Sequence, residues 1–148
     1  MSEVCPECGA AWSDEATCTD YFHQLLFWED ENPANWEVHH LTVLCYHLQH
    51  PSLYAPTGLQ HAKGLLVRFV DEGVSPQRLR VQMRDQVDSG QRKFKITATA
   101  ESQGAYDQPI AWSLTAADVV AAGIDRYIER VHAWARATLA DLRASGNL

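Results

Sequence analysis

Apolar side chains recur every three or four residues along most of the chain, a spacing that predicts amphipathic helices. The first such stripe consists of Tyr21, Phe22, Leu25, Leu26 and Trp28. Thr17 and Asp20 before it form a Thr-x-x-Asp capping box, whose side chains satisfy backbone N–H groups at a helix start. The pattern therefore predicts a helix from Thr17, with Ser13 or Asp14 as alternative starts.

Proline marks both ends of the second predicted helix. Asn32 can cap the helix and Pro33 suits its first position, because proline lacks the N–H that would be unpaired there. The helix should end at Pro51. It then contains the stretch HHLTVLCYHLQHP, residues 39–51, which holds four of the seven histidines in the chain.

Two further helices are predicted before residue 91. Thr57 and Gln60 form another capping box, and the helix that they begin should end at Gly73. A fourth helix should begin at Ser75-Pro76 and end near Gly90.

The period of the pattern changes to two after residue 91, where Phe94, Ile96 and Ala98 alternate with polar residues. This alternation is typical of a strand, and residues 105–112 are the nearest partner, although Pro109 weakens that segment. A final long helix is predicted from Thr115, because Thr115 and Asp118 form a third capping box, and it should continue to about residue 145.

Together these elements predict a mainly α fold. We expect an antiparallel bundle of about five helices, with an N-terminal CxxC knuckle and a short β-hairpin or extended insertion before the last helix. The 148 residues suffice for one domain. Within it we expect a metal-knuckle arm (1–16), helices (17–90), a hairpin or loop (91–113) and a long C-terminal helix (114–146).

The composition is typical of a globular protein and argues against a membrane-spanning, secreted or nucleic-acid-binding one. A hydrophobic fraction of 46% is ordinary for a globular chain, and no apolar run approaches the roughly 20 residues of a membrane span. The start MSEVCPECGA lacks the basic and apolar regions of a secretory signal, so we expect a cytoplasmic protein. The net charge of -7 makes nucleic-acid binding and attachment to an anionic membrane unfavourable.

In a reducing compartment the four cysteines are expected to bind metal or perform redox chemistry rather than form disulfides. Cys5 and Cys8 belong to the sequence CPECG, in which two thiolates can bind one ion, and the following Gly9 permits a turn that directs backbone N–H groups toward the sulfurs. Zinc suits such thiolates best. A redox pair is the alternative, but that use normally accompanies a βαβ pattern, which is not visible here.

A structural zinc needs four ligands, and no second CxxC is present. If the first two helices pair antiparallel with Asp30 level with Asn35, residues whose numbers sum to about 65 face each other. Cys18 then lies level with His47 and within one turn of His50.

Helix geometry also separates the histidines, because a rise of 1.5 Å per residue places His40 about 15 Å from His50. The predicted metal ligands are therefore Cys5, Cys8, Cys18 and His50. His47 or His40 are the alternatives to His50, and His47 can also support the site from outside.

The other residues of these types have simpler interpretations. Buried histidines usually find a hydrogen-bond partner, so one of His39 and His40 is expected to lie in a helix interface. Cys45 lies among apolar residues and is expected to pack as a small hydrophobic side chain. His23, His61 and His132 are expected to be surface or packing residues.

The chain resembles a bacterial family of small uncharacterised proteins that begin CPxCGA and carry a helix reading HxLTVxxYxxQHP. The matching segments here are residues 5–10 and 40–51. The resemblance implies a shared constellation of Cys5, Cys8, Cys18, His40 and His50, without a named activity. The family pattern has Asp where this chain has Cys45, which argues against a general role for that cysteine.

Three functions follow from these residues. The first is a zinc-binding helical protein with a structural metal, acting as a binding or regulatory module for an unknown protein or small-molecule partner. The second is a metal-dependent hydrolase or transferase with an open zinc position, in which His47 or His40, or less suitably Glu29 or Glu37, accepts a proton. The third is a redox sensor in which oxidation of Cys5 and Cys8 releases the ion.

Overall fold

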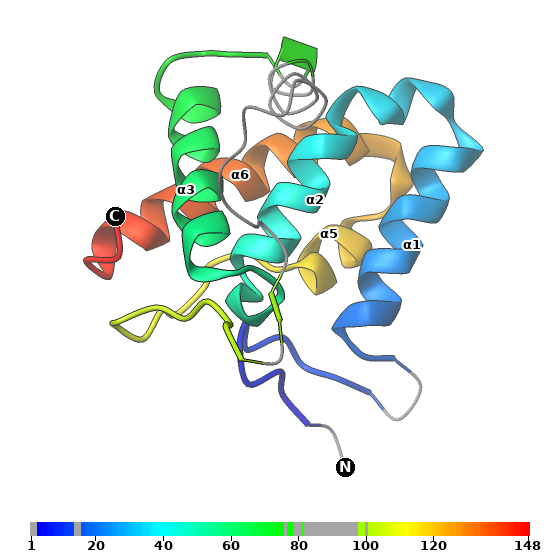
Figure 1. Ribbon diagram of the computed structural model, residues 1–148. Coiled ribbons are helices and arrows are strands. Elements are labelled where there is room, and N and C mark those ends of the chain that lie inside the picture. The colour runs from blue at the N-terminus through cyan, green and yellow to red at the C-terminus, as the bar shows by residue number, and fades with distance from the viewer. Residues whose placement is uncertain (1–2, 14–15, 76, 79–80, 82–97, 100) are drawn as a thin grey trace.

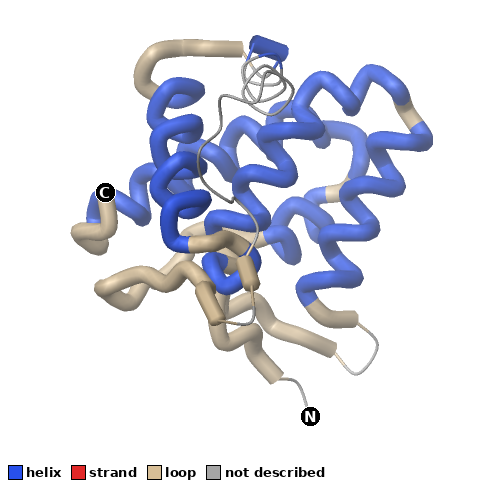
Figure 2. Tube along the Cα trace, viewed as in Figure 1, coloured by secondary structure: helices blue, strands red, loops and turns tan. Residues whose placement is uncertain are grey.

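The structure is a computed structural model that describes residues 3–13, 16–75, 77–78, 81, 98–99 and 101–148. Helices make up most of these residues, and the long helices pack side by side above a layer of loops that contains the N-terminal arm (Figures 1 and 2). The predicted mainly helical fold is confirmed. In the part of the chain that is described, no helix is long and apolar enough to cross a membrane.

The first helix, α1, spans Cys18–Glu31, and its start agrees with the prediction. Thr17 is the N-cap, and the Asp20 carboxylate accepts hydrogen bonds from both the backbone N–H (2.8 Å) and the hydroxyl (3.0 Å) of Thr17. This capping box places Cys18 in the first helical position. The side chain of Cys18 is thereby held by an ordered helix end rather than a loop.

The second predicted helix is divided into two parts. Residues Pro33–Val38 form a 3-10 helix, η1, and the α-helix α2 covers only His39–Leu48. Asn32 caps η1 as predicted, accepting a hydrogen bond from the Ala34 N–H at 3.2 Å. A short 3-10 turn, η2 (Pro51–Leu53), begins at the proline that was expected to end the helix.

The tight η1 segment changes the alignment of α1 and α2. The rings of Phe22 and Tyr46 stack with centroids 4.1 Å apart, and His39 Nδ1 lies 2.8 Å from Glu29 Oε1. Both pairs have residue numbers that sum to 68, not the predicted 65. The prediction was wrong because η1 uses several residues to reverse the chain before α2 begins.

Helix α3 spans Pro56–Val70 and begins one residue before the predicted capping box. Pro56 occupies the first helical position and Ala55 is the N-cap, so Thr57 does not start the helix as expected. The predicted fourth helix, from Ser75-Pro76 to Gly90, lies largely outside the described residues.

The predicted strand around residues 91–98 also lies largely outside the described residues. The described residues beside it contain an isolated antiparallel bridge between Thr99 and Ser102. Residues 105–112 are assigned to no helix or strand and bend at residues 107–108. Because residues 91–97 lie outside the described residues, the hairpin and the extended insertion both stay predictions.

The predicted long C-terminal helix is interrupted. Helix α5 covers Ala116–Ala122 with the expected capping box, a 3-10 turn, η3, covers Ile124–Arg126, and α6 covers Tyr127–Ala144. Gly123 between them has φ 87° and ψ 173°, a conformation that only glycine adopts readily. This break lets α5 pack against α1 while α6 passes behind α2 and α3 (Figure 1).

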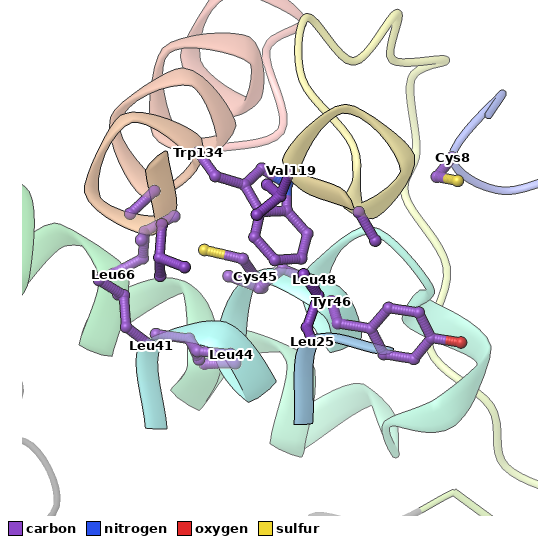
Figure 3. Close-up of a cluster of buried hydrophobic side chains, with 14 of the residues drawn as sticks. Cys8, Leu25, Leu41, Leu44, Cys45, Tyr46, Leu48, Leu66, Val119 and Trp134 are labelled. Atoms are coloured by element: carbon purple, nitrogen blue, oxygen red, sulfur yellow. The ribbon is translucent and has the colours of Figure 1, made fainter. Parts of the chain in front are cut away.

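The main core lies between α2, α3 and α6, with α1 and α5 closing one side. Its largest fully buried side chains include Trp134, Tyr127, Leu25 and Leu41. Cys45 is completely buried in this core, where it faces Thr138 on α6 and lies beside Trp134 (Figure 3). Burial raises the pKa of its thiol, as expected for a cysteine that packs as a hydrophobic residue.

A polar network ties the helices together within this apolar environment. The Glu29 carboxylate is fully buried and accepts hydrogen bonds from His39 Nδ1–H at 2.8 Å and the Tyr127 hydroxyl at 2.9 Å. The Thr42 hydroxyl lies 3.0 Å from the same Tyr127 oxygen. Helices α1, α2 and α6 are thus joined at one point, and His39 is an interface histidine as predicted.

Candidate metal centre

The N-terminal knuckle is a tight turn built around the CPECG motif. Gly9 has φ 78°, and the turn is closed by hydrogen bonds from Gly9 N–H to the Cys5 carbonyl and from Cys5 N–H to the Ala10 carbonyl, both 2.9 Å. The positive φ matters because a residue with a Cβ would be strained there. The turn brings the Cys5 and Cys8 sulfurs to the same side, as the motif predicts.

The other two predicted ligands, Cys18 and His50, come from the ends of α1 and α2. Cys18 opens α1, and His50 lies two residues beyond the last residue of α2. Their residue numbers also sum to 68, so they belong to the register set by Phe22 with Tyr46 and Glu29 with His39. The shift from the predicted register therefore brings His50, and not His47, level with Cys18.

The four side chains form a buried three-cysteine, one-histidine cluster. Their candidate ligand atoms all lie within 4.8 Å of one another. Cys8 Sγ is 3.4 Å from Cys18 Sγ, and Cys5 Sγ is 3.6 Å from His50 Nε2. Ligand atoms about 2.3 Å from a tetrahedral zinc ion are separated by roughly 3.8 Å. The two measured pairs share no atom, so they match two opposite edges of such a tetrahedron.

Hydrogen-bond donors surround the sulfurs. The backbone N–H of Ala10 donates to Cys8 Sγ at 3.4 Å, that of Cys8 to Cys5 Sγ at 3.5 Å, and Trp12 Nε1–H to Cys18 Sγ at 3.1 Å. Each sulfur thus has an N–H donor, which stabilises a thiolate. Such donors commonly support cysteine ligands in metal sites.

The imidazole of His50 is oriented in the way that metal-ligating histidines usually are. Its Nδ1–H donates to the Tyr46 carbonyl at 2.7 Å, which leaves Nε2 directed to the cluster. The Tyr46 ring lies against it, with centroids 4.3 Å apart. The orientation is therefore fixed by the last turn of α2.

Burial makes the cluster unfavourable for charged thiolates without a cation. Each of the four residues is at most 6% exposed. Burial raises the pKa of the Cys8 and Cys18 thiols and lowers the pKa of the His50 imidazole. Both directions favour neutral groups. A divalent cation reverses this preference because it stabilises the thiolates directly, so the chemistry of the donor set fits a metal ion such as zinc.

The alternative ligands lie elsewhere. His47 and His40 line a cavity between α2 and α3 and do not belong to the cluster. His40 is thus separated from the constellation that the resemblance implied, as the 15 Å estimate along the helix required. Glu29 lies at the opposite end of α1 from Cys18, too far away to act on a ligand at the cluster.

Several supporting residues were not found from the sequence. Trp12 carries the shortest donor to a cluster sulfur, but tryptophan in a sequence is usually expected to pack in the core. Glu7 accepts hydrogen bonds from the backbone N–H (3.0 Å) and hydroxyl (2.7 Å) of Ser52, which fastens the knuckle to η2. Glu7 lies inside the CPECG motif, so a polar residue between the two cysteines was the available signal.

Gln49 is a further unrecognised residue, located immediately before His50. Its side chain is fully buried and donates to the Leu114 carbonyl at 2.7 Å and the Thr138 hydroxyl at 3.3 Å. These bonds hold the end of α2 against α6 and the segment before α5. A glutamine in an otherwise apolar helix face was the signal for such a buried link.

The fold and the cluster define a mainly helical protein with a buried Cys/His site that can hold a metal ion. The chain belongs to a family of unknown function, DUF5946, whose model matches residues 3–143. This agrees with the expected resemblance to an uncharacterised family, whose motifs and bacterial origin stay predictions. No curated protein and no solved structure matches the chain significantly.

Proposed function

We propose that Cys5, Cys8, Cys18 and His50 bind one zinc ion, and that this ion has a structural role. The observation that supports the proposal is the convergence of four buried ligand atoms within 4.8 Å, from three separate parts of the chain. Structural zinc sites use four such protein ligands in a tetrahedron. The ion would connect the arm to the ends of α1 and α2.

A structural role for the ion is supported by the small number of other interactions that hold the N-terminal arm, residues 3–13. Residues 3–13 contribute no regular secondary structure apart from an isolated bridge between Val4 and Ala11. The arm is also attached by the Glu7 to Ser52 bonds and by the Tyr21 hydroxyl, which donates to the Ala11 carbonyl at 2.9 Å. A metal ion would add a much stronger connection than these bonds.

Four protein ligands would leave no coordination position for a catalytic water. Three thiolates also donate much charge to the ion and weaken it as a Lewis acid. We therefore propose a binding or regulatory module of the cytoplasm, in which zinc maintains the fold and another surface receives a protein or small-molecule partner.

Metal analysis of purified protein tests the proposal. Wild type should contain about one zinc per chain, and Cys8→Ala and His50→Ala should each lose it. Cys45→Ala and His47→Ala are matched controls, because they remove a cysteine and a histidine outside the cluster, and both should retain the metal. Wild type prepared without oxidation that contains no metal, or a His47→Ala variant that loses it, would contradict the assignment.

Cobalt substitution adds a test of geometry. A cobalt ion held tetrahedrally by three thiolates and one imidazole produces strong visible and sulfur-to-metal absorption bands. Cys18→Ser should weaken the sulfur bands, whereas Cys45→Ser should leave them unchanged. Weak bands typical of an octahedral ion in wild type would indicate coordinated water and would argue for the open zinc position of a hydrolase or transferase.

A further inference from the structure

The cavity between α2 and α3 that His40 and His47 line is separate from the cysteine cluster. Its volume is about 360 Å³, within the range of roughly 300–1,000 Å³ typical of small-molecule sites. Helices α2 and α3 run beside each other (Figure 1), and residues of both helices line the cavity. None of the four proposed zinc ligands lines it.

The walls are largely hydrocarbon with a small number of imidazoles. The apolar lining includes Val43 and Leu44 from α2 and Leu65 from α3. The histidines of the lining are His40, His47 and His61. An apolar cavity with a few polar groups is the usual composition of a site that binds a small organic molecule.

The polar side chains of the described lining are three imidazoles and the Tyr54 phenol. Burial raises the pKa of the Tyr54 phenol, so this hydroxyl stays uncharged, and the Tyr54 ring contacts the ring of His47. The two rings meet edge to face, with centroids 5.5 Å apart. No acidic side chain, lysine or arginine occurs among the described residues of the lining. A charged ligand would therefore lose its hydration without gaining a counter-ion.

From the volume, the apolar walls and the imidazoles, we propose that this cavity binds a small, uncharged and mainly hydrocarbon ligand with one or two hydrogen-bonding groups. The hydrocarbon part would contact Val43, Leu44 and Leu65. The polar group would face the imidazole edge, where a neutral histidine can both donate and accept a hydrogen bond. The site is distinct from the cysteine cluster and does not require the proposed zinc role.

The test uses the full-length protein and two fluorescent probes of similar size. N-phenyl-1-naphthylamine is uncharged, and 1-anilinonaphthalene-8-sulfonate adds a sulfonate to the same ring system. Wild type should bind the neutral probe with micromolar affinity and the sulfonate at least tenfold more weakly. Equal affinity for both probes, or no binding of the neutral probe, would overturn the proposal.

Variants locate the binding. Ala62 is 2% exposed and lines the cavity, so Ala62→Leu should fill part of the space and weaken binding of the neutral probe at least tenfold. Ala140→Leu makes the same change on an exposed position of α6 and should have no effect. If Ala62→Leu does not fold, as judged by circular dichroism, Val43→Phe fills the cavity from α2. Unchanged binding in a folded cavity-filling variant would overturn the site.

Metal analysis of the same samples separates this proposal from the zinc proposal. Ala62→Leu should lose probe binding and keep its metal, whereas His50→Ala should lose its metal. A second metal equivalent in wild type that disappears in His47→Ala would identify the histidines as ligands. That result would overturn the assignment of an uncharged organic ligand.

Discussion

The two ends of the α1–α2 pair are connected by different chemistry. At one end Cys18 and His50 meet in the cysteine cluster, and at the other Glu29 accepts a hydrogen bond from His39. The cluster contains groups that burial keeps neutral and that gain most from an added cation. At the other end, His39 and Tyr127 already donate hydrogen bonds to the Glu29 carboxylate, so no added ion is needed there. One end of the same helix pair should therefore depend on metal, and the other should not.

The largest expected effect is the removal of metal. Apparent binding energies of structural zinc reach about 10–16 kcal/mol in small zinc-binding peptides, and part of that energy should stabilise this fold. A chelator should abolish hydrogen-exchange protection in residues 3–13 and around Cys18, while amides near Glu29 and Tyr127 stay protected. Equal loss of protection at both ends would contradict the separation of the two regions.

Breaking the Glu29 network is expected to have the next largest effect. Glu29→Ala removes a buried carboxylate and leaves His39 and Tyr127 without their acceptor, which should cost about 3–5 kcal/mol of unfolding free energy. Glu29→Gln keeps the shape and should cost about 1–3 kcal/mol. Urea unfolding measures both.

Glu31→Gln is the matched control, because Glu31 is exposed at the end of the same helix. It should change stability by less than about 0.5 kcal/mol. All three variants should retain metal. Loss of metal from Glu29→Gln would show that the two ends of the helix pair are not independent.

The break at Gly123 should matter because it positions Tyr127 for its bond to Glu29. Gly123→Ala places a Cβ on a backbone with φ 87° and should cost about 1–3 kcal/mol. Gly64→Ala, at an exposed position inside α3 with no neighbouring atom within 4 Å, should stabilise by about 0.5–1 kcal/mol. Opposite shifts in thermal unfolding would support the assignment, and a stabilising Gly123→Ala would contradict it.

The smallest expected effect is the contribution of His47, which lies near the cysteine cluster, to the pH dependence of the unfolding free energy. Its pKa falls from 6.5 to about 4 in the fold, so between these values the unfolded chain binds more protons. Stability from the neutral imidazole is thus complete above pH 6.5 and is lost as the pH falls toward 4. His47→Gln should reduce the loss of unfolding free energy between pH 7 and pH 5, measured on metal-loaded protein. An identical pH dependence in both proteins would contradict the shift.

Local sequence signals were reliable where the interaction spans a few residues. The capping boxes at Thr17 and Thr115 were predicted correctly, because both partners lie within one helical turn. The box at Thr57 failed, since Pro56 also suits the first helical position and the helix begins there. The prediction of one continuous C-terminal helix was wrong, because the apolar periodicity continues across Gly123 and does not indicate the break.

The sequence by itself determined the residue types of the candidate site, the tight knuckle and the helical class, because CxxC spacing, Gly9 and apolar periodicity act over short distances. Only the tertiary structure decided which histidine faces Cys18. That choice depends on how many residues η1 uses to reverse the chain, a length set by packing across the helix pair. The α2–α3 cavity and the Glu29 network depend on the same packing, since each joins residues that have no local relation in the sequence.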